Sequence, residues 1–99
     1  MITEHVLVHI TSGQESAFEA SVAQALPIIT AAPGCHQAVV RRQFEDPSTY
    51  LLLIDWESVE AHMAFRQSDL FPKWKELTWA FYDQPAQVSH FHQPFLSQP

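Results

Sequence analysis

The sequence is poor in several residue types, and each scarcity excludes a class of protein. Its 99 residues include one cysteine, two glycines and five basic residues against eleven acidic ones. A single cysteine, Cys35, cannot form an internal disulfide, and this suits a reducing compartment. A formal charge of −6 would be repelled by phosphate backbones and by anionic lipid. We therefore expect neither a nucleic acid nor a membrane as a partner.

Long hydrophobic runs are also missing. The N-terminus has no basic region followed by an apolar run, and no segment approaches the roughly 18 apolar residues of a membrane span. The cytoplasm is the expected location. A hydrophobic content of 46% suits one small domain over residues 1–99, with its core in residues 2–93. The tail at residues 94–99, rich in Pro, Gln and Ser, is expected to be loose.

The first half of the chain is a succession of periodic segments. Residues 1–10 alternate as a strand does, with one face formed by Ile2, Glu4, Val6, Val8 and Ile10. Ser12 and Glu15 have the spacing of a capping box at a helix start, and Pro27 predicts that this helix kinks or ends there. Residues 35–44 and 50–56 predict an antiparallel hairpin around a short loop of turn-forming residues.

The second half predicts two helices and a last strand. Ser58 and Ser68 are candidate N-caps of the helices, and residues 86–92 alternate as a strand. The complete order predicts an α+β, ferredoxin-like split βαβ fold: a four-stranded antiparallel sheet with helices on one face. The apolar run at residues 51–54 indicates a central strand that is covered on both faces. A second copy of the chain is the simplest cover for the face that the helices leave open.

The segment from Trp56 to Trp74 combines many aromatic residues with one histidine and one arginine, as a pocket for a flat organic molecule would. Further motifs are Pro33-Gly34-Cys35, Glu45-Asp46-Pro47…Tyr50 and Trp56-Glu57-Ser58. Together they resemble the antibiotic biosynthesis monooxygenase (ABM) domain family over residues 2–95. One branch of the family shares Glu60-Ala61-His62, Phe65-Arg66-x-Ser68, Phe71…Trp74, Phe81-Tyr82-Asp83 and Val88…His90-Phe91. The resemblance implies a homodimer, a dimeric α/β barrel, with a ligand pocket between each subunit's sheet and helices.

The resemblance also implies a chemistry. The cofactor-free branch oxidises phenolic or quinol-type substrates with molecular oxygen, and it requires no metal, flavin or nucleotide. The haem-degrading branch depends on an asparagine, a tryptophan and a histidine, and this sequence has Val6, Phe65 and Lys75 at those places. We therefore expect no cofactor, with a small aromatic molecule and dioxygen as partners.

His62 and Arg66 are the candidate catalytic residues. His62 lies three residues before Phe65, on the same face of the short helix, and an imidazole suits proton transfer near neutral pH. The alternative is a surface histidine bonded to a backbone carbonyl. Arg66 can hold a phenolate oxygen, or it can pair with a nearby acid such as Glu60 or Asp69. The candidate pocket residues are Trp56, Phe65, Phe71, Trp74, Phe81 and His90, and the aromatic ones would equally serve as core.

The other histidines suggest a metal site as an alternative. His5 and His9 share a face of the first strand, while His90 and His92 share a face of the last strand, its expected neighbour. Four imidazoles could therefore gather on one surface. Their spacing has no metal-specific geometry, so we expect packing rather than a metal.

Three functions remain open. The first is a cofactor-independent oxygenase acting on a phenolic or quinol-type metabolite, which the resemblance favours. The second is a non-oxidative isomerase or cyclase-like enzyme on the same fold. The third is a module that binds an aromatic ligand and performs no chemistry.

Overall fold

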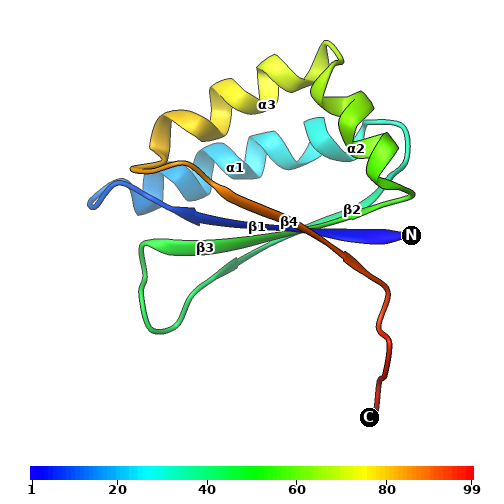
Figure 1. The fold of residues 1–99 in the computed structure, drawn as a ribbon. Coiled ribbons are helices and arrows are strands. Elements are labelled where there is room, and N and C mark those ends of the chain that lie inside the picture. The colour runs from blue at the N-terminus through cyan, green and yellow to red at the C-terminus, as the bar shows by residue number, and fades with distance from the viewer.

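The computed structural model describes all 99 residues, and its helices cover one face of a four-stranded antiparallel sheet (Figure 1). The strands lie in the order β2-β3-β1-β4. Along the chain the elements are β1 (Ile2–His9), α1 (Glu15–Thr30), β2 (Cys35–Arg42), β3 (Thr49–Trp56), α2 (Val59–Arg66), α3 (Leu70–Thr78), a short 3-10 helix (Trp79–Phe81) and β4 (Gln87–His92). The predicted α+β, ferredoxin-like fold is confirmed.

The alternation of the first strand decides which residues lie under the helices. Glu4, Val6 and Val8 are buried, as is Ile10 just beyond the strand, whereas the residues between them are only half-buried. From α1, the buried stripe is formed by Phe18, Val22, Ala25 and Ile29. The predicted inward face of the first strand is confirmed, and it places one carboxylate, that of Glu4, within an apolar layer.

Two predictions about α1 are wrong. The helix starts at Glu15 without a side-chain cap, because the Glu15 carboxylate accepts hydrogen bonds from the Ser48 hydroxyl and the Gly13 amide. Pro27 does not end the helix, since α1 continues for three residues to Thr30, and the alternative of a kink at Pro27 stays a prediction. Ala25 and Ile29 pack against the sheet on either side of Pro27, so the burial of this stripe outweighs the one backbone hydrogen bond that a proline removes.

The start of α2 is fixed by two local features. Ser58 is its N-cap and accepts a hydrogen bond from the Ala61 amide at 3.1 Å, as predicted. Gly34 has φ +84°, and a Cβ at this position would lie 2.8 Å from Cβ of Ala61. The glycine therefore lets the turn before β2 approach α2 closely. Ser68 accepts a hydrogen bond from the Leu70 amide at 3.2 Å, just before α3.

The face of the sheet opposite the helices is not covered by any element of the chain, and we call it the bare face (Figure 1). Leu51 and Leu53 face it and are half-buried, whereas Leu52 and Ile54 face the helices and are buried. The helices of one chain thus cover one face of β3, and the predicted cover of its other face by a second copy stays a prediction. Phe91 of β4 also lies on the bare face and is about half exposed, in contact with the ring of His5.

Two further features are the C-terminal tail and the lengths of the helices. Residues 93–99 follow β4 without a helix or strand, and they extend away from the sheet (Figure 1). The longest helix, α1, has 16 residues, and none of the helices has the length and apolar character needed to cross a membrane.

Candidate functional site

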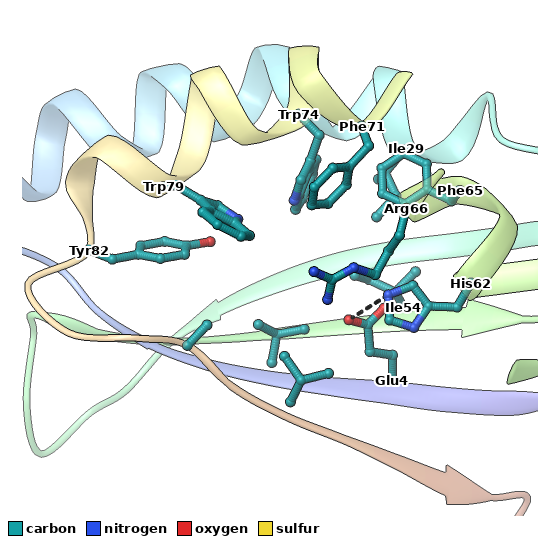
Figure 2. A pocket seen from close by; sticks show the side chains of 13 residues that line it. Glu4, Ile29, Ile54, His62, Phe65, Arg66, Phe71, Trp74, Trp79 and Tyr82 are labelled. Carbon is teal, nitrogen blue, oxygen red and sulfur yellow. Dashed lines mark ion pairs between the residues drawn. The ribbon is translucent and has the colours of Figure 1, made fainter. Parts of the chain in front are cut away.

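A small chamber lies between the sheet and the helices, at the end where α2 and α3 meet (Figure 2). Its volume is about 60 Å³. It is lined by Glu4, Val6, Ile29, Ile54, His62, Phe65, Arg66, Phe71, Trp74, Trp79, Tyr82, Ala86 and Val88. A cavity of about 150 Å³ is known to hold benzene. The inner chamber therefore has room for dioxygen or a water molecule, but not for an aromatic ring.

A second, wider hollow of about 440 Å³ adjoins this chamber. We call the two the inner chamber and the outer pocket. They share five lining residues: Arg66, Trp79, Tyr82, Ala86 and Val88. The outer pocket is completed by Asp83, Gln84 and Pro85, in the loop before β4, and is open to solvent. By volume, the outer pocket is large enough for a one- or two-ring aromatic molecule.

Glu4 is the acidic group of the inner chamber, and it is held from two sides. The indole Nε1–H of Trp56 donates to Glu4 Oε1 at 2.8 Å, and His62 Nε2 lies 3.4 Å from Glu4 Oε2. Both Glu4 and His62 are only 4% exposed. The His62 ring stacks on the Trp56 indole, with ring centroids 5.2 Å apart, and its Nδ1 lies 2.8 Å from Nε2 of His90.

Burial shifts the pKa of both groups toward their neutral forms. Burial raises the pKa of Glu4, whereas the Trp56 hydrogen bond and the positive charge of Arg66 lower it by a smaller amount. It lowers the pKa of His62 from 6.5 to about 4, and the neighbouring His90 and Arg66 act in the same direction. At neutral pH His62 is therefore uncharged, so its 3.4 Å contact with Glu4 is not an ion pair.

Arg66 projects from the end of α2 over the Glu4 carboxylate and faces both hollows (Figure 2). Its guanidinium carbon lies 5.1 Å from the centroid of the Phe71 ring, a cation–π contact that orients the side chain. No carboxylate lies within ion-pair distance of Arg66, so the expected pairing with Glu60 or Asp69 does not occur. Its N–H donors are therefore free for an oxygen atom of a ligand.

Tyr82 adds a neutral donor at the boundary of the two hollows. Its hydroxyl points toward the inner chamber, beside Trp79 (Figure 2). Burial raises the pKa of Tyr82 to about 12, so the hydroxyl keeps its proton at neutral pH. Arg66 and Tyr82 together can stabilise an oxyanion placed between the hollows.

The structure distributes the predicted pocket residues over three places. Phe65, Phe71 and Trp74 line the inner chamber with His62 and Arg66. Trp56 and His90 lie behind His62 and contact it without lining the chamber. Phe81 lies elsewhere: the 3-10 helix after α3 turns its ring onto Phe18, with centroids 5.9 Å apart. Its prediction as a pocket residue is therefore not met.

The four strand histidines do not gather on one surface. The pairing of β1 with β4 puts His90 opposite Glu4, so His90 lies on the helix side of the sheet. His5 pairs with Ser89 and lies on the bare face, against Phe91. Nowhere in the chain do three metal-binding side chains of His, Cys, Asp or Glu converge in an arrangement that could hold an ion.

Sequence reasoning missed the roles of Glu4, Trp79 and Tyr82 at the site. The signal for Glu4 was present, because it is the one charged residue on the inward face of an apolar strand. A carboxylate in such a position needs hydrogen-bonding partners. Trp79 and Tyr82 carry no comparable signal, because their directions depend on the 3-10 helix that replaces the last turn of α3.

Comparisons with known proteins define the family. The model of the antibiotic biosynthesis monooxygenase family matches residues 1–77. The uncharacterised protein YczJ of Bacillus subtilis (strain 168) is 37% identical over 92 residues, which are 92% of this chain and 97% of YczJ. A crystal structure from Bordetella bronchiseptica, named as a candidate antibiotic biosynthesis monooxygenase, is 40% identical. It superposes with a TM-score of 0.90 over 95% of this chain and 97% of that one.

A more distant structure carries a defined activity in its name. SnoaB of Streptomyces nogalater, a cofactor-independent oxygenase solved as a variant, superposes with a TM-score of 0.82. The match covers 99% of this chain and 96% of SnoaB, but the sequences are only 15% identical, so it shows a shared fold. Taken with the closer matches, the fold and the site define an α+β domain with a cavity between its layers. The chain belongs to the antibiotic biosynthesis monooxygenase family.

Proposed function

We propose that this protein is a cofactor-independent monooxygenase that oxidises a small phenolic or quinol-type aromatic metabolite with molecular oxygen. One observation carries the proposal: a buried carboxylate–imidazole pair, Glu4 and His62, lies under the free guanidinium of Arg66 where an aromatic-lined pocket narrows. Such a site can remove a proton from a phenol and hold the resulting phenolate. The relationship to SnoaB by fold supports oxygen as the second substrate.

The sizes of the two hollows support a division of tasks. The substrate ring would lie in the outer pocket of about 440 Å³, against Trp79 and Val88. Its hydroxyl oxygen would reach between Arg66 and Tyr82 toward Glu4. The inner chamber of about 60 Å³ would admit dioxygen next to the reacting ring carbon. With the substrate ring in the outer pocket, the mostly apolar walls of the inner chamber would exclude water, which would otherwise protonate reactive intermediates.

The reaction is balanced without an external reductant. The Glu4–His62 pair takes the phenolic proton, and the electron-rich phenolate transfers electrons to dioxygen, so that a C–O bond forms at a ring carbon. The pair then returns the proton to the outer peroxide oxygen. The pair takes the ring C–H proton as the O–O bond breaks and the ring carbon becomes a carbonyl, and the hydroxide that leaves is protonated by solvent to water. The pair then releases the C–H proton to solvent. One phenol and one dioxygen thus give one quinone and one water.

The test is oxygen uptake with a dihydroxynaphthalene that has one hydroxyl on each ring. We expect uptake of one dioxygen per quinone formed, and heavy-labelled dioxygen should place one labelled atom in the quinone. Arg66→Met should raise KM and lower kcat, because the oxyanion loses its positive partner. Lys73→Met, on the exposed surface of α3, is the matched control and should behave as the wild type.

Two results would contradict the proposal. Turnover of a keto or lactone substrate at the same rate without oxygen would favour a non-oxidative isomerase, since the same proton-transfer groups would serve it. If naphthols bind and raise the Tm of the protein, but no product forms over a long incubation, the protein would instead be a binding module.

We further propose that two copies pair through the bare sheet face. The apolar residues of this face include Leu7, Leu51, Leu53 and Phe91, which one chain leaves partly exposed. Burial of such a face is the usual reason for a two-fold dimer. Sedimentation should give twice the 11.3 kDa chain mass for the wild type, and Leu53→Glu should give the monomer. An 11.3 kDa wild-type species would contradict the dimer.

A further inference from the structure

Three side chains form a continuous line from the inner chamber toward the surface. Glu4 Oε2 lies 3.4 Å from His62 Nε2, and His62 Nδ1 lies 2.8 Å from His90 Nε2. Glu4 and His62 are both buried, whereas His90 is partly exposed on the edge strand β4. Both ring nitrogens of His62 thus face protein groups: Nδ1 is hydrogen-bonded to His90, and Nε2 lies beside the Glu4 carboxylate.

The donor and acceptor at each contact follow from the chemistry of the groups. The Glu4 carboxylate accepts only, and the Trp56 indole donates to its Oε1. His62 Nε2 lies 3.4 Å from the other oxygen, and a carboxylate there favours the tautomer that carries its proton on Nε2. A neutral imidazole has one donor and one acceptor nitrogen, so His62 Nδ1 accepts. His90 Nε2 must then donate to it. All donors in the line point toward Glu4.

We infer that Glu4, rather than His62, is the catalytic proton acceptor of the inner chamber, and that His62 and His90 form the path by which Glu4 exchanges protons with solvent. This inference rests on the proposed function for its catalytic part and on the contacts alone for the path. His62 and His90 are positioning residues in it, because neither touches the substrate.

The path balances in both directions. A solvent proton binds His90 Nδ1, the Nε2 proton of His90 moves to His62 Nδ1, and the Nε2 proton of His62 moves to Glu4. The carboxylate is then a carboxylic acid, and both rings are again neutral with their protons on Nδ1. The reverse series starts from this second arrangement, returns one proton to solvent and restores the first arrangement. A substrate proton taken by Glu4 therefore leaves only while both rings carry their protons on Nδ1, so uptake of a solvent proton and release of a substrate proton alternate. No charged imidazole persists in either arrangement, which agrees with the burial of His62.

Other groups near Glu4 set the energy of its two charge states. From α2 it faces His62 and Arg66, from β4 it faces His90, and from β3 it faces Trp56. Tyr82 and Cys35 are near enough that the Glu4 charge raises the pKa of each. Arg66 is the only cation in this set, and it favours the carboxylate that must accept a proton.

Ring-nitrogen NMR tests the path without any substrate. In the wild type at neutral pH we expect His62 to carry its proton on Nε2 and His90 to carry its proton on Nε2. Protonation of Glu4 should move the ring signals of both histidines in one step, and Glu4→Gln should abolish that step. Glu60→Gln, an exposed glutamate on α2, is the matched control and should preserve it. A proton on Nδ1 of His62 at neutral pH, or independent titration of the groups, would overturn the path.

Turnover tests the catalytic part. Glu4→Gln should lower kcat about a hundred- to ten-thousand-fold, the usual contribution of a positioned base. His90→Gln separates structure from proton transfer, because the amide can donate to His62 Nδ1 but cannot pass a proton on. We expect it to keep the His62 tautomer and to lose turnover, with the pH profile altered. His90→Ala should regain turnover when imidazole is added, and His36→Gln, an exposed histidine, should be unaffected.

The outcomes distinguish the path from the function. Wild-type activity in His90→Gln, or no rescue of His90→Ala by imidazole, would overturn the path. Full activity in Glu4→Gln would overturn Glu4 as the acceptor. An inactive wild type whose histidine signals still follow Glu4 would refute the oxygenase and leave the proton path intact.

Discussion

The two ends of the layer between sheet and helices are built from different chemistry. One end holds Phe18 against Tyr50, with ring centroids 4.9 Å apart, and is closed by aromatic packing. The other holds the Glu4 carboxylate among Trp56 and His62, beside a chamber that packing does not fill. Both ends lie on the same strands, since Val8 pairs with Tyr50 and Glu4 pairs with Ile54.

This difference shows which end of the layer stabilises the fold and which end costs stability. At the aromatic end every buried ring removes apolar area from water, which is the main stabilising contribution to folding. At the polar end a buried carboxylate and an uncharged histidine have pKa values that burial shifts against their charged forms. Groups of this kind cost stability, and they are typical of functional sites.

The largest expected effect is at the aromatic end. Phe18→Ala removes a ring that is fully buried and should lower the free energy of unfolding by about 3–5 kcal/mol. Urea denaturation measures this change. The ring-nitrogen signals of His62 should stay in place, because the Phe18 ring packs against Tyr50, Phe81 and Tyr82 and not against His62. A shift of those signals would mean that the two ends are coupled.

The pH dependence of stability should come from the polar end. The unfolded chain binds a proton on His62 below pH 6.5, but the folded chain does so only near pH 4. Stability should therefore fall as the pH drops from 6.5 to about 4, by at most about 3 kcal/mol, and then level off.

This measurement is best made in the Glu4→Gln variant. In the wild type, the raised pKa of Glu4 lowers stability as the pH rises above 4.5, which opposes the contribution of His62. Thermal unfolding of Glu4→Gln and of the double variant with His62→Gln gives the comparison, and the double variant should show a flatter profile. Equal slopes in the two variants would show that His62 is not the group responsible.

The smallest expected effect is a gain in the stability of the folded state. Because burial raises the pKa of Glu4, the folded state disfavours the carboxylate at neutral pH. Glu4→Gln should therefore stabilise the protein by about 1.4 kcal/mol for each unit of that rise, and it should have no effect below the unfolded pKa. Tm measured at pH 7 and at pH 4 checks this. A lower Tm at pH 7 would mean that the carboxylate is a net stabilising group.

The sequence predicted the fold well because the fold depends on periodic burial. The alternation in β1 and the stripe of Phe18 to Ile29 in α1 both lie where their spacing puts them. The capping box at Ser12 and the helix end at Pro27 were wrong, because contacts distant in sequence outweighed the local pattern. Glu15 bonds to Ser48, and the α1 stripe packs on the sheet through Pro27.

The site was predicted in part, for a similar reason. His62, Arg66 and Phe65 share one short helix, so their common direction follows from helical spacing. The meeting of His62 with Glu4 and His90 depends on the register of β4 against β1, which no local pattern specifies. Phe81 was misplaced because the 3-10 helix rotates it away from the stripe of α3.

A crystal structure with the dihydroxynaphthalene bound is the most direct test of the account. We predict that the rings lie in the outer pocket against Trp79, with one hydroxyl oxygen between the Arg66 guanidinium and the Glu4 carboxylate. A ligand that instead binds on the bare sheet face, or one that leaves Arg66 and Glu4 without contact, would contradict it.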